Sequence, residues 1–257
     1  MGVVEVQLDG PVATLRLNRP EARNALSIEL CRGFTESLES IDEDRTARVV
    51  IVKGEGKVFC SGADLSAVSG PGGLEFLPEF ERMLESLSRF RLPTIARIHG
   101  AALGGGLQLA TCCDFRVAST DARLGIPSSR LGIVINFENV QRLVLQVGMP
   151  MAKQVLMTGQ LFSGEQAERA GLVNRVTAPE TLDEEIEELS RSIAAAAPLS
   201  VQGAKRAIAA VTDQFLGIDN DPSDEIAGLV AQAYHSKDLQ EGLKALAEKR
   251  SPDFTGE

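Results

Sequence analysis

The chain has 257 residues, of which 44% are hydrophobic, and this is enough for one large domain with an ordinary buried core. Its formal net charge is −10 and no stretch is rich in Lys or Arg. This argues against a nucleic-acid or anionic-membrane surface, because both depend on cations that neutralise phosphates. No apolar run approaches the ~20 residues of a membrane helix, and the N-terminus lacks the charged and then apolar regions of a signal peptide. We therefore expect a soluble, cytoplasmic protein with no membrane insertion and no nucleic-acid partner.

Strands and helices alternate along the first half of the chain. Apolar and polar residues alternate over 3–8 and 12–17, on either side of Asp9-Gly10-Pro11, and this predicts a β-hairpin. Ser27 is then placed to cap a helix whose apolar residues recur at helical spacing. The same criteria predict strands over 48–52, 57–60, 94–98 and 114–118, and helices that carry residues 77–90, follow the glycines at 104–106 and span 138–147. This alternation predicts an α/β domain. Periodicity alone does not distinguish a doubly wound sheet from a spiral.

The second part of the chain is predominantly helical. Ser163-Gly164-Glu165-Gln166 matches a capping box, and 173–176 is the last predicted strand. Beyond that strand the pattern predicts helices alone, with breaks at Pro198, 219–222 and 251–252. The acidic run 183–188 is typical of a solvated helix face rather than of a metal site.

The four cysteines point to structure rather than chemistry. They lack the paired C-x-x-C spacing of metal sites, and each lies in a segment that is predicted to be buried. In such places cysteine behaves as a small apolar residue. We expect them to fill the core, and we expect no metal site; they are Cys31, Cys60, Cys112 and Cys113.

Three consecutive glycines, Gly104-Gly105-Gly106, follow the predicted strand 94–98 and open a short apolar helix. The first N–H groups of a helix have no internal partner and lie at the positive end of its dipole. Because glycine lets a ligand touch the main chain, this helix start is a candidate oxyanion hole. The alternative is a turn that only permits close packing of strand and helix. A nucleotide-binding loop is less favoured still, since the spacing matches neither GxGxxG nor GxxxxGK[ST].

A second strand ends in a small-residue turn, in the stretch Gly56-Lys57-Val58-Phe59-Cys60-Ser61-Gly62-Ala63-Asp64-Leu65. Together with Asn18-Arg19-Pro20 upstream, the two turns resemble the crotonase (enoyl-CoA hydratase/isomerase) superfamily, and the resemblance covers nearly the whole chain. It implies that two backbone N–H groups hold the carbonyl oxygen of a CoA thioester. The matching residues here are Ala63 and Gly105.

The resemblance also implies a fold and an assembly. The fold is an α/β spiral of ββα units over residues 1–197, followed by a helical C-terminal segment, residues 198–257, that packs on neighbouring subunits. The assembly is a homotrimer or a dimer of trimers, which the sequence pattern does not show by itself. Apolar residues of the segment expected to be buried between subunits are Ile226, Leu229, Val230, Leu239, Leu243 and Leu246.

Family members that hydrate enoyl-CoA use two glutamates to hold and activate a water molecule, and this chain has neither at the matching positions. The first position, one helical turn beyond Gly105, is Gln108, and the second, after Pro127, is Ser128. A carboxamide does not take up a proton near neutral pH, and a lone serine hydroxyl is a poor base. Both residues can still line the pocket and orient water or substrate by hydrogen bonding. The alternatives are a surface amide for Gln108 and a turn residue for Ser128.

A nearby carboxylate comes from the segment 132–139, which departs from the glycine-rich segment of the hydratases. Glu138 there is a candidate base or nucleophile, or an ordinary first-turn glutamate that complements the helix dipole. Carboxylates of the predicted helix between Glu75 and Glu85 are further candidates for a base. His99 lies at a strand end near the glycines, where a lone histidine is most often structural.

For the CoA part of the ligand, the resemblance implies that Arg23 lies near the phosphates, where its forked donors suit the ligand. A surface arginine is the alternative. The turn formed by Ala63, Asp64, Leu65 and Ser66 matches the family turn whose backbone meets the bend between adenine and pantetheine. No cofactor is implied apart from the coenzyme A of the substrate itself.

Two functions remain open at this stage. One is an enzyme of fatty-acid or related metabolism, a lyase or isomerase that acts on an acyl-CoA through an enolate-like intermediate; the oxyanion hole favours it, because polarising a carbonyl serves a reaction. The other is an acyl-CoA binding or carrier protein that kept the hole and lost the acid–base pair. The two missing glutamates favour the carrier and predict weak hydration.

Overall fold

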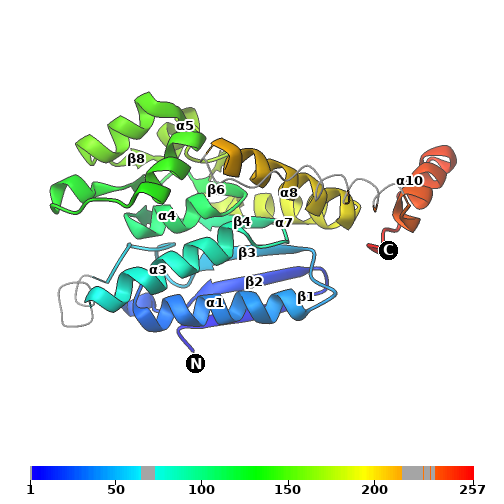
Figure 1. Cartoon of the computed structure of the whole chain (residues 1–257), viewed down its shortest axis with the longest axis horizontal. Helices are drawn as coiled ribbons and strands as arrows, with labels where there is room; N and C mark the ends of the chain where they lie inside the picture. Colours follow the sequence, from blue (N-terminus) through cyan, green and yellow to red (C-terminus); the bar gives the residue numbers. More distant parts are fainter. Residues whose placement is uncertain (1, 65–72, 216–227, 229–231, 233–234) are drawn as a thin grey trace.

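The computed structural model describes residues 2–64, 73–215, 228, 232 and 235–257. Figure 1 shows a layered α/β body from which the C-terminal helices extend to one side. One sheet of six strands, in the order β1-β2-β3-β4-β6-β9, runs through this body. The strands are β1 (Val4–Asp9), β2 (Val12–Leu17), β3 (Val49–Gly54), β4 (Thr94–Ile98), β6 (Phe115–Ser119) and β9 (Arg175–Thr177). The first two form the predicted antiparallel hairpin, and the later neighbours pair in parallel.

A second, smaller sheet distinguishes the two architectures that periodicity leaves open. It consists of β5 (Ala101–Leu103), β7 (Arg123–Gly125) and β8 (Phe162–Ser163) in the order β5-β7-β8. Strand β5 follows β4 and β7 follows β6, so these two strands of the large sheet are each succeeded by a short strand of the other sheet. Helical elements then follow, namely α4 (Gly105–Cys112) after β5, and η2 (Pro127–Arg130) with α5 (Phe137–Thr158) after β7. This recurring ββα order is that of the predicted spiral.

The strand expected over 57–60 is reduced to a single bridge between Cys60 and Ala102. Its neighbours bond to different segments, because Phe59 N donates to His99 O at 2.9 Å and Ser61 N donates to Arg23 O at 3.1 Å. The helix expected over 138–147 is confirmed as the first part of α5, because the helical backbone breaks at Gly148, whose φ of 72° is left-handed. A second helical stretch, which was not predicted, continues from there to Thr158.

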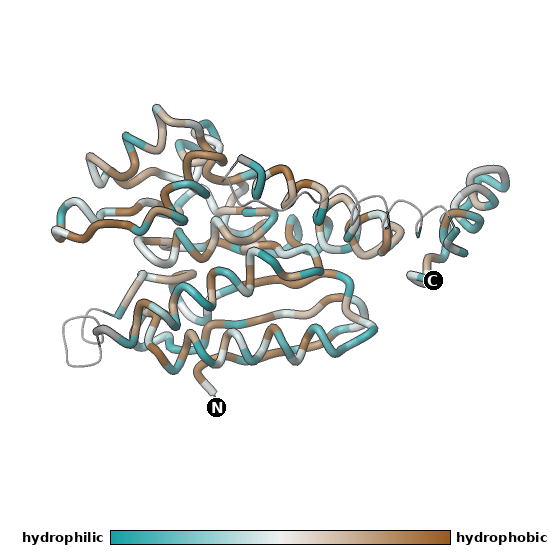
Figure 2. The backbone as a smooth tube through the Cα atoms, viewed as in Figure 1, coloured by the Kyte–Doolittle hydropathy of each residue, from teal (hydrophilic) through white to brown (hydrophobic). Residues whose placement is uncertain are grey.

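The two faces of the large sheet bury different helices. Val50 and Val52 of β3 belong to the main core, which also contains the buried stripes of α1 (Ile28–Glu43) and α3 (Gly73–Ser88). The alternate residues of the strand, Val49 and Ile51, pack in a smaller cluster with α7 (Leu182–Ala194). Figure 2 shows the hydrophobic colour concentrated along these strands. A strand buried on both faces is what a parallel sheet between two helical layers requires.

Local signals fix several helix ends as predicted. Ser27 Oγ accepts a hydrogen bond from Leu30 N at 3.2 Å at the start of α1, and Ser163 with Gln166 forms the expected capping box of α6 (Gly164–Arg169). The remaining described helical elements are η1 (Pro20–Ala22), η3 (Pro179–Thr181), α8 (Pro198–Phe215) and α10 (Lys237–Glu248).

The cysteines fill the core as expected, since all four are free and buried. Burial raises the pKa of Cys31 and of Cys60 to about 12 and that of Cys112 to about 11, so none of these three thiols is poised as a nucleophile.

The acidic run at the start of α7 is more than a solvated face. Asp183 pairs with Arg97 at 2.5 Å, and this hydrogen bond lowers the pKa of the Asp183 carboxyl; Glu185 pairs with Arg175. Within the described ranges, no group of three or more His, Cys, Asp or Glu side chains could hold a metal ion. Among those same residues, no helix is long and apolar enough to cross a bilayer.

Candidate active site

Three short segments end side by side at one edge of the smaller sheet. Cys60 N donates to Ala101 O and Leu103 N donates to Cys60 O, both at 3.0 Å, so the segment before Ser61 runs parallel to β5. Strand β5 is in turn parallel to β7. Parallel neighbours reach the same edge together, and the residues that follow them are therefore brought together there. Those residues are Gly62 and Ala63, then Gly104 and Gly105, then Pro127 and Ser128.

The first two turns approach each other closely, and glycine is required for the approach. Gly62 has a φ of 103°, which L side chains rarely adopt, and a Cβ on it would lie 2.7 Å from Leu103 O and 3.4 Å from Gly105 N. Gly104 also has a positive φ, 53°, and its N–H donates to Gly125 O at 2.8 Å. These contacts place the nitrogen of Gly105 directly beside the turn that carries Ala63.

The backbone N–H groups of Ala63 and Gly105 are available to a ligand. Leu26 N donates to Gly62 O at 2.8 Å and Asp64 N donates to Leu26 O at 2.9 Å, so this parallel bridge uses the residues on either side of Ala63 and leaves its own N–H pointing away. Gly105 is the first residue of α4, at the positive end of its dipole. In the part of the chain that the structure describes, neither N–H has a hydrogen-bond partner. Two neighbouring backbone donors of this kind can stabilise an oxyanion.

Gln108 and Ser128 are both buried and both lack hydrogen bonds from their side chains to any described residue. Gln108 lies one turn into α4 and is 7% exposed, and Ser128 lies in η2 and is 8% exposed. A polar side chain at such a position ordinarily bonds to protein or to water. Their burial disfavours a plain surface amide at Gln108, and it fits the predicted lining of a pocket.

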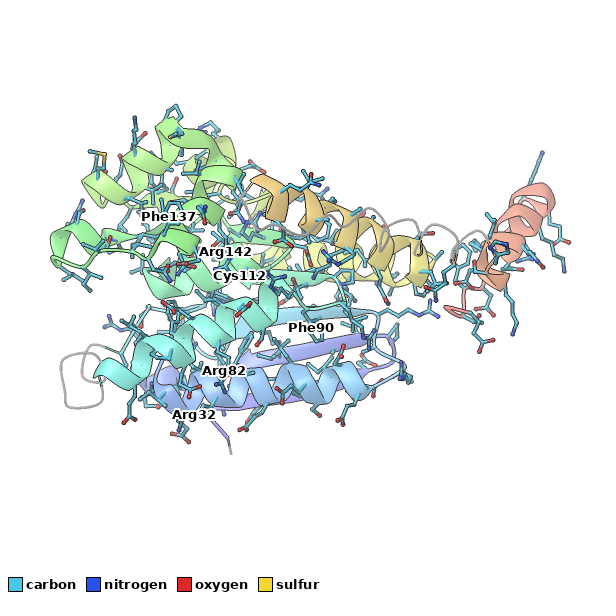
Figure 3. All side chains as sticks on the ribbon, viewed as in Figure 1. Arg32, Arg82, Phe90, Cys112, Phe137 and Arg142 are labelled. Carbon is cyan, nitrogen blue, oxygen red and sulfur yellow. The ribbon has the colours of Figure 1, made fainter. Side chains whose placement is uncertain are left out.

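The segment 132–136 and helix α3 are tied together beside these residues. Asn136 caps α5 by accepting from Asn139 N at 3.2 Å, and its amide donates to Glu81 of α3 at 2.8 Å. Glu138 is exposed, and no described residue pairs with its carboxylate. Figure 3 shows Phe137 at the start of α5, above α4. The carboxylate that contacts this segment is therefore Glu81, while Glu138 occupies the position of a first-turn glutamate.

Comparisons with known proteins identify the family. A sequence model of the enoyl-CoA hydratase/isomerase family matches residues 8–257. The chain belongs to this family. It is 34% identical over 249 residues to the crotonyl-CoA hydratase of Syntrophomonas wolfei, covering 95% of this chain and 94% of that one. It is 36% identical over 256 residues to an enoyl-CoA isomerase/hydratase of Mycosarcoma maydis, and this match covers 94% of this chain and 92% of that one.

The fold agrees with this assignment. The crystal structure of an enoyl-CoA hydratase/carnithine racemase from Magnetospirillum magneticum superposes with a TM-score of 0.93 at 32% identity, and covers 100% of this chain and 97% of that one. The resemblance to the crotonase superfamily and the predicted α/β fold are thereby confirmed.

The residues predicted to hold CoA in this family member lie around the Ala63 turn. Arg23 is exposed, has no ion pair with any described residue, and accepts from Ser61 N through its carbonyl at 3.1 Å. Asp64 pairs instead with Arg19 at 3.1 Å. Leu65 and Ser66 lie outside the described residues.

Sequence reasoning missed two side chains that hold this turn. Asn24 is fully buried at a φ of 54°, and its Nδ2 lies within 3.2 Å of the carbonyl oxygens of Glu55, Val58 and Phe59. Arg19 bonds to Asp64 and to Ala25 O. Arg19 stands in the motif that carries the family resemblance, but the acceptors of both side chains are distant in sequence, so local patterns do not reveal them.

His99 has a structural environment. Its Nε2 donates to Gly56 O at 3.0 Å, and its Nδ1 accepts from Arg97 at 3.0 Å, which assigns the neutral tautomer from the partners. Burial and the positive charge of Arg97 lower the pKa of His99, although its hydrogen bond to Gly56 opposes the shift. Both ring nitrogens are occupied within the protein, as the structural alternative predicts.

This environment predicts a pH dependence of stability. The unfolded histidine has its ordinary pKa near 6.5, and the folded one binds its proton more weakly, so His99 destabilises the fold as the pH falls below about 6.5. Denaturant unfolding at about pH 7.5 and about pH 5 should show a smaller loss of stability for His99→Gln than for the wild type, because glutamine keeps a donor for Gly56 O and cannot be protonated. Equal losses would contradict this assignment.

Proposed function

We propose that this protein binds the acyl-CoA thioesters of fatty-acid or related metabolism and stabilises an enolate-like form of the thioester. The observation that carries the proposal is the close approach of the two turns, in which Gly105 N lies 3.4 Å from the site of a Gly62 Cβ and the N–H groups of Ala63 and Gly105 have no described partner. A thioester oxygen placed between them accepts both hydrogen bonds, and these strengthen as negative charge develops on it. Arg23 supplies a cation for the CoA phosphates, and CoA enters as part of the substrate, with no other cofactor proposed.

Hydration is proposed to be weak. Gln108 and Ser128 stand where the family's hydratases carry the pair of glutamates, and neither accepts a proton near neutral pH. The reaction that suits this site is an isomerisation, or another step through the enolate, with its base outside those two positions. Glu81 and Glu138 are the candidates, and Glu81 accepts a hydrogen bond from Asn136 at 2.8 Å.

The second candidate function is a non-catalytic acyl-CoA carrier. The specific observation that favours it is that the buried Gln108 and Ser128 offer hydrogen bonds and no base. Both functions require the same binding of the thioester, and turnover separates them.

The acyl chain is proposed to be apolar. Leu131 N and Ile133 N both donate to Ser128 O at 3.0 Å, so the loop after η2 folds back on the site. Large apolar side chains remain exposed on this loop and its neighbours: Leu77 (54%), Leu131 (58%), Ile133 (41%), Val134 (92%) and Phe137 (70%). An alkyl chain that leaves the site would cover part of this surface.

We also propose that the C-terminal segment, 198–257, packs against other subunits in a homotrimer or a dimer of trimers. Helix α8 leaves Ile208 68% exposed and Val211 53% exposed, and α10 leaves Leu239 39% exposed, which an assembly would bury. Three further residues expected at this interface, Ile226, Leu229 and Val230, lie outside the described residues, as do the side chains of Leu243 and Leu246.

Calorimetric titration with saturated acyl-CoAs of increasing length tests the binding. We expect saturable binding whose affinity rises up to about fourfold for each methylene that becomes buried. Phe137→Ser should flatten this dependence on chain length, whereas Met157→Ser, at a residue that is 73% exposed near the far end of α5, should not. A lack of saturable binding with every acyl-CoA would contradict the proposal.

Hydration of crotonyl-CoA, followed by loss of the conjugated absorbance, tests the chemistry. Because one general acid or base is worth ~10²–10⁴ in rate, the wild type should hydrate far more slowly than a family hydratase, and Gln108→Glu with Ser128→Glu should raise the rate. Rapid hydration by the wild type would refute the role given to these two positions. The Glu138→Gln and Glu81→Gln variants, assayed in parallel, would then identify the base.

Light scattering tests the assembly. We expect the mass of a trimer or a hexamer at micromolar concentration. Ile208→Asp with Val211→Asp should shift this mass toward the monomer, because a charge buried at an interface without a partner is costly. A monomeric wild type would remove the role proposed for the C-terminal segment.

A further inference from the structure

The link between the β1–β2 hairpin and α1 lies against the turn that carries Ala63. Three backbone hydrogen bonds join the two segments: Ser61 N donates to Arg23 O at 3.1 Å, Leu26 N to Gly62 O at 2.8 Å, and Asp64 N to Leu26 O at 2.9 Å. Both peptide neighbours of Ala63 are therefore fixed to residues of the link. The direction of the Ala63 N–H depends on how rigidly the link itself is held.

One guanidinium holds the two segments together. Arg19 Nη2 donates to Asp64 Oδ2 at 3.1 Å and Arg19 Nη1 donates to Ala25 O at 2.6 Å. Asp64 directly follows Ala63, and Ala25 directly precedes Leu26. The guanidinium of Arg19 is therefore hydrogen-bonded to both segments of the Leu26–Ala63 bridge. The side chains of Arg19 and Asp64 are each 20% exposed, which limits screening of the pair by solvent.

We propose that Arg19, acting through Asp64 and Ala25, is a positioning residue for the oxyanion hole. The inference rests on the proposed function, because it concerns the N–H group of Ala63 that is proposed to bind the thioester oxygen. Arg19 itself touches no reacting atom. It fixes the peptide plane between Gly62 and Ala63 before the ligand arrives, and the hydrogen bond to a developing oxyanion then needs little reorganisation.

The chemistry of arginine is specific to this task. A planar fork presents two donors in a fixed relation, and here one reaches a carboxylate and the other a carbonyl. Lysine carries the same charge at a single nitrogen and cannot reproduce both directions. Asn24 also supports the turn, but its removal would leave the half-buried carbonyl of Val58 and the buried carbonyl of Phe59 without their donor, so it is unsuitable as a test.

The experiment measures the infrared stretching band of the thioester carbonyl in octanoyl-CoA labelled with ¹³C at that carbon, bound to the full chain. Hydrogen bonds from the hole weaken the C=O bond and move the band to lower frequency than in water. Arg19→Met should retain saturable binding but lose most of this shift, and Arg19→Lys should recover part of it. If turnover is measurable, kcat should fall about tenfold or more with a smaller change in KM, because the lost stabilisation belongs to the transition state.

The matched control is Arg91→Met. Arg91 also pairs with one carboxylate oxygen, Asp42 Oδ1 at 2.6 Å, and donates to one carbonyl, Asp42 O at 2.8 Å, but at the opposite end of α1. The Arg91→Met variant should lower the melting temperature and leave the carbonyl band at the frequency that it has in the wild-type complex. Asp64→Leu, which has a similar size and no acceptor for Arg19, replaces Arg19→Met if that variant does not fold.

The outcomes separate the two claims. A full band shift retained in Arg19→Met, or in Asp64→Leu, would overturn the positioning role alone and leave the proposed function intact. A wild-type band at the frequency of the free ligand would overturn the oxyanion hole and the positioning role together. A shift lost equally in Arg91→Met would show general destabilisation and would also overturn the inference.

Discussion

The candidate site depends on the parallel pairing of one irregular segment, around Cys60, with strand β5. This pairing lets Gly62 approach Leu103 O so closely that a Cβ would lie 2.7 Å from the oxygen, a distance at which the backbone would have to move. Gly106 is equally restricted, because its Cβ would lie 2.4 Å from Cys60 O. The helix start and the Ala63 turn are therefore held as one unit by backbone contacts.

Much of the fold follows from local sequence signals. The hairpin is encoded by alternation around Gly10, and helix α1 by the Ser27 cap together with its apolar stripe. Parallel strands buried on both faces read as short apolar runs, so β3 and β4 fall within a residue or two of their predicted positions. The smaller sheet could not be predicted in this way, because its strands have two or three residues and are specified by pairing with distant segments.

The site, too, combines features that local sequence predicts with features that depend on contacts between distant residues. The turn at Gly62 and the helix start at Gly105 were identifiable because small residues follow a strand at both places, and at Gly62 another backbone approaches so closely that only glycine fits. Gln108 and Ser128 were placed by the family resemblance, and the structure buries both of them. Asn136 and Glu81 are 55 positions apart in the sequence, and Arg19 and Asp64 are 45 positions apart. No local sequence pattern encodes hydrogen bonds between residues so distant.

A crystal structure of the protein with a bound acyl-CoA tests the oxyanion hole most directly. We predict that the thioester oxygen lies ~2.7–3.1 Å from both Ala63 N and Gly105 N. The alkyl chain should then run toward Val134 and Phe137. A bound thioester whose oxygen contacts neither nitrogen, or one seated outside the edge where β5 and β7 end, would contradict the account.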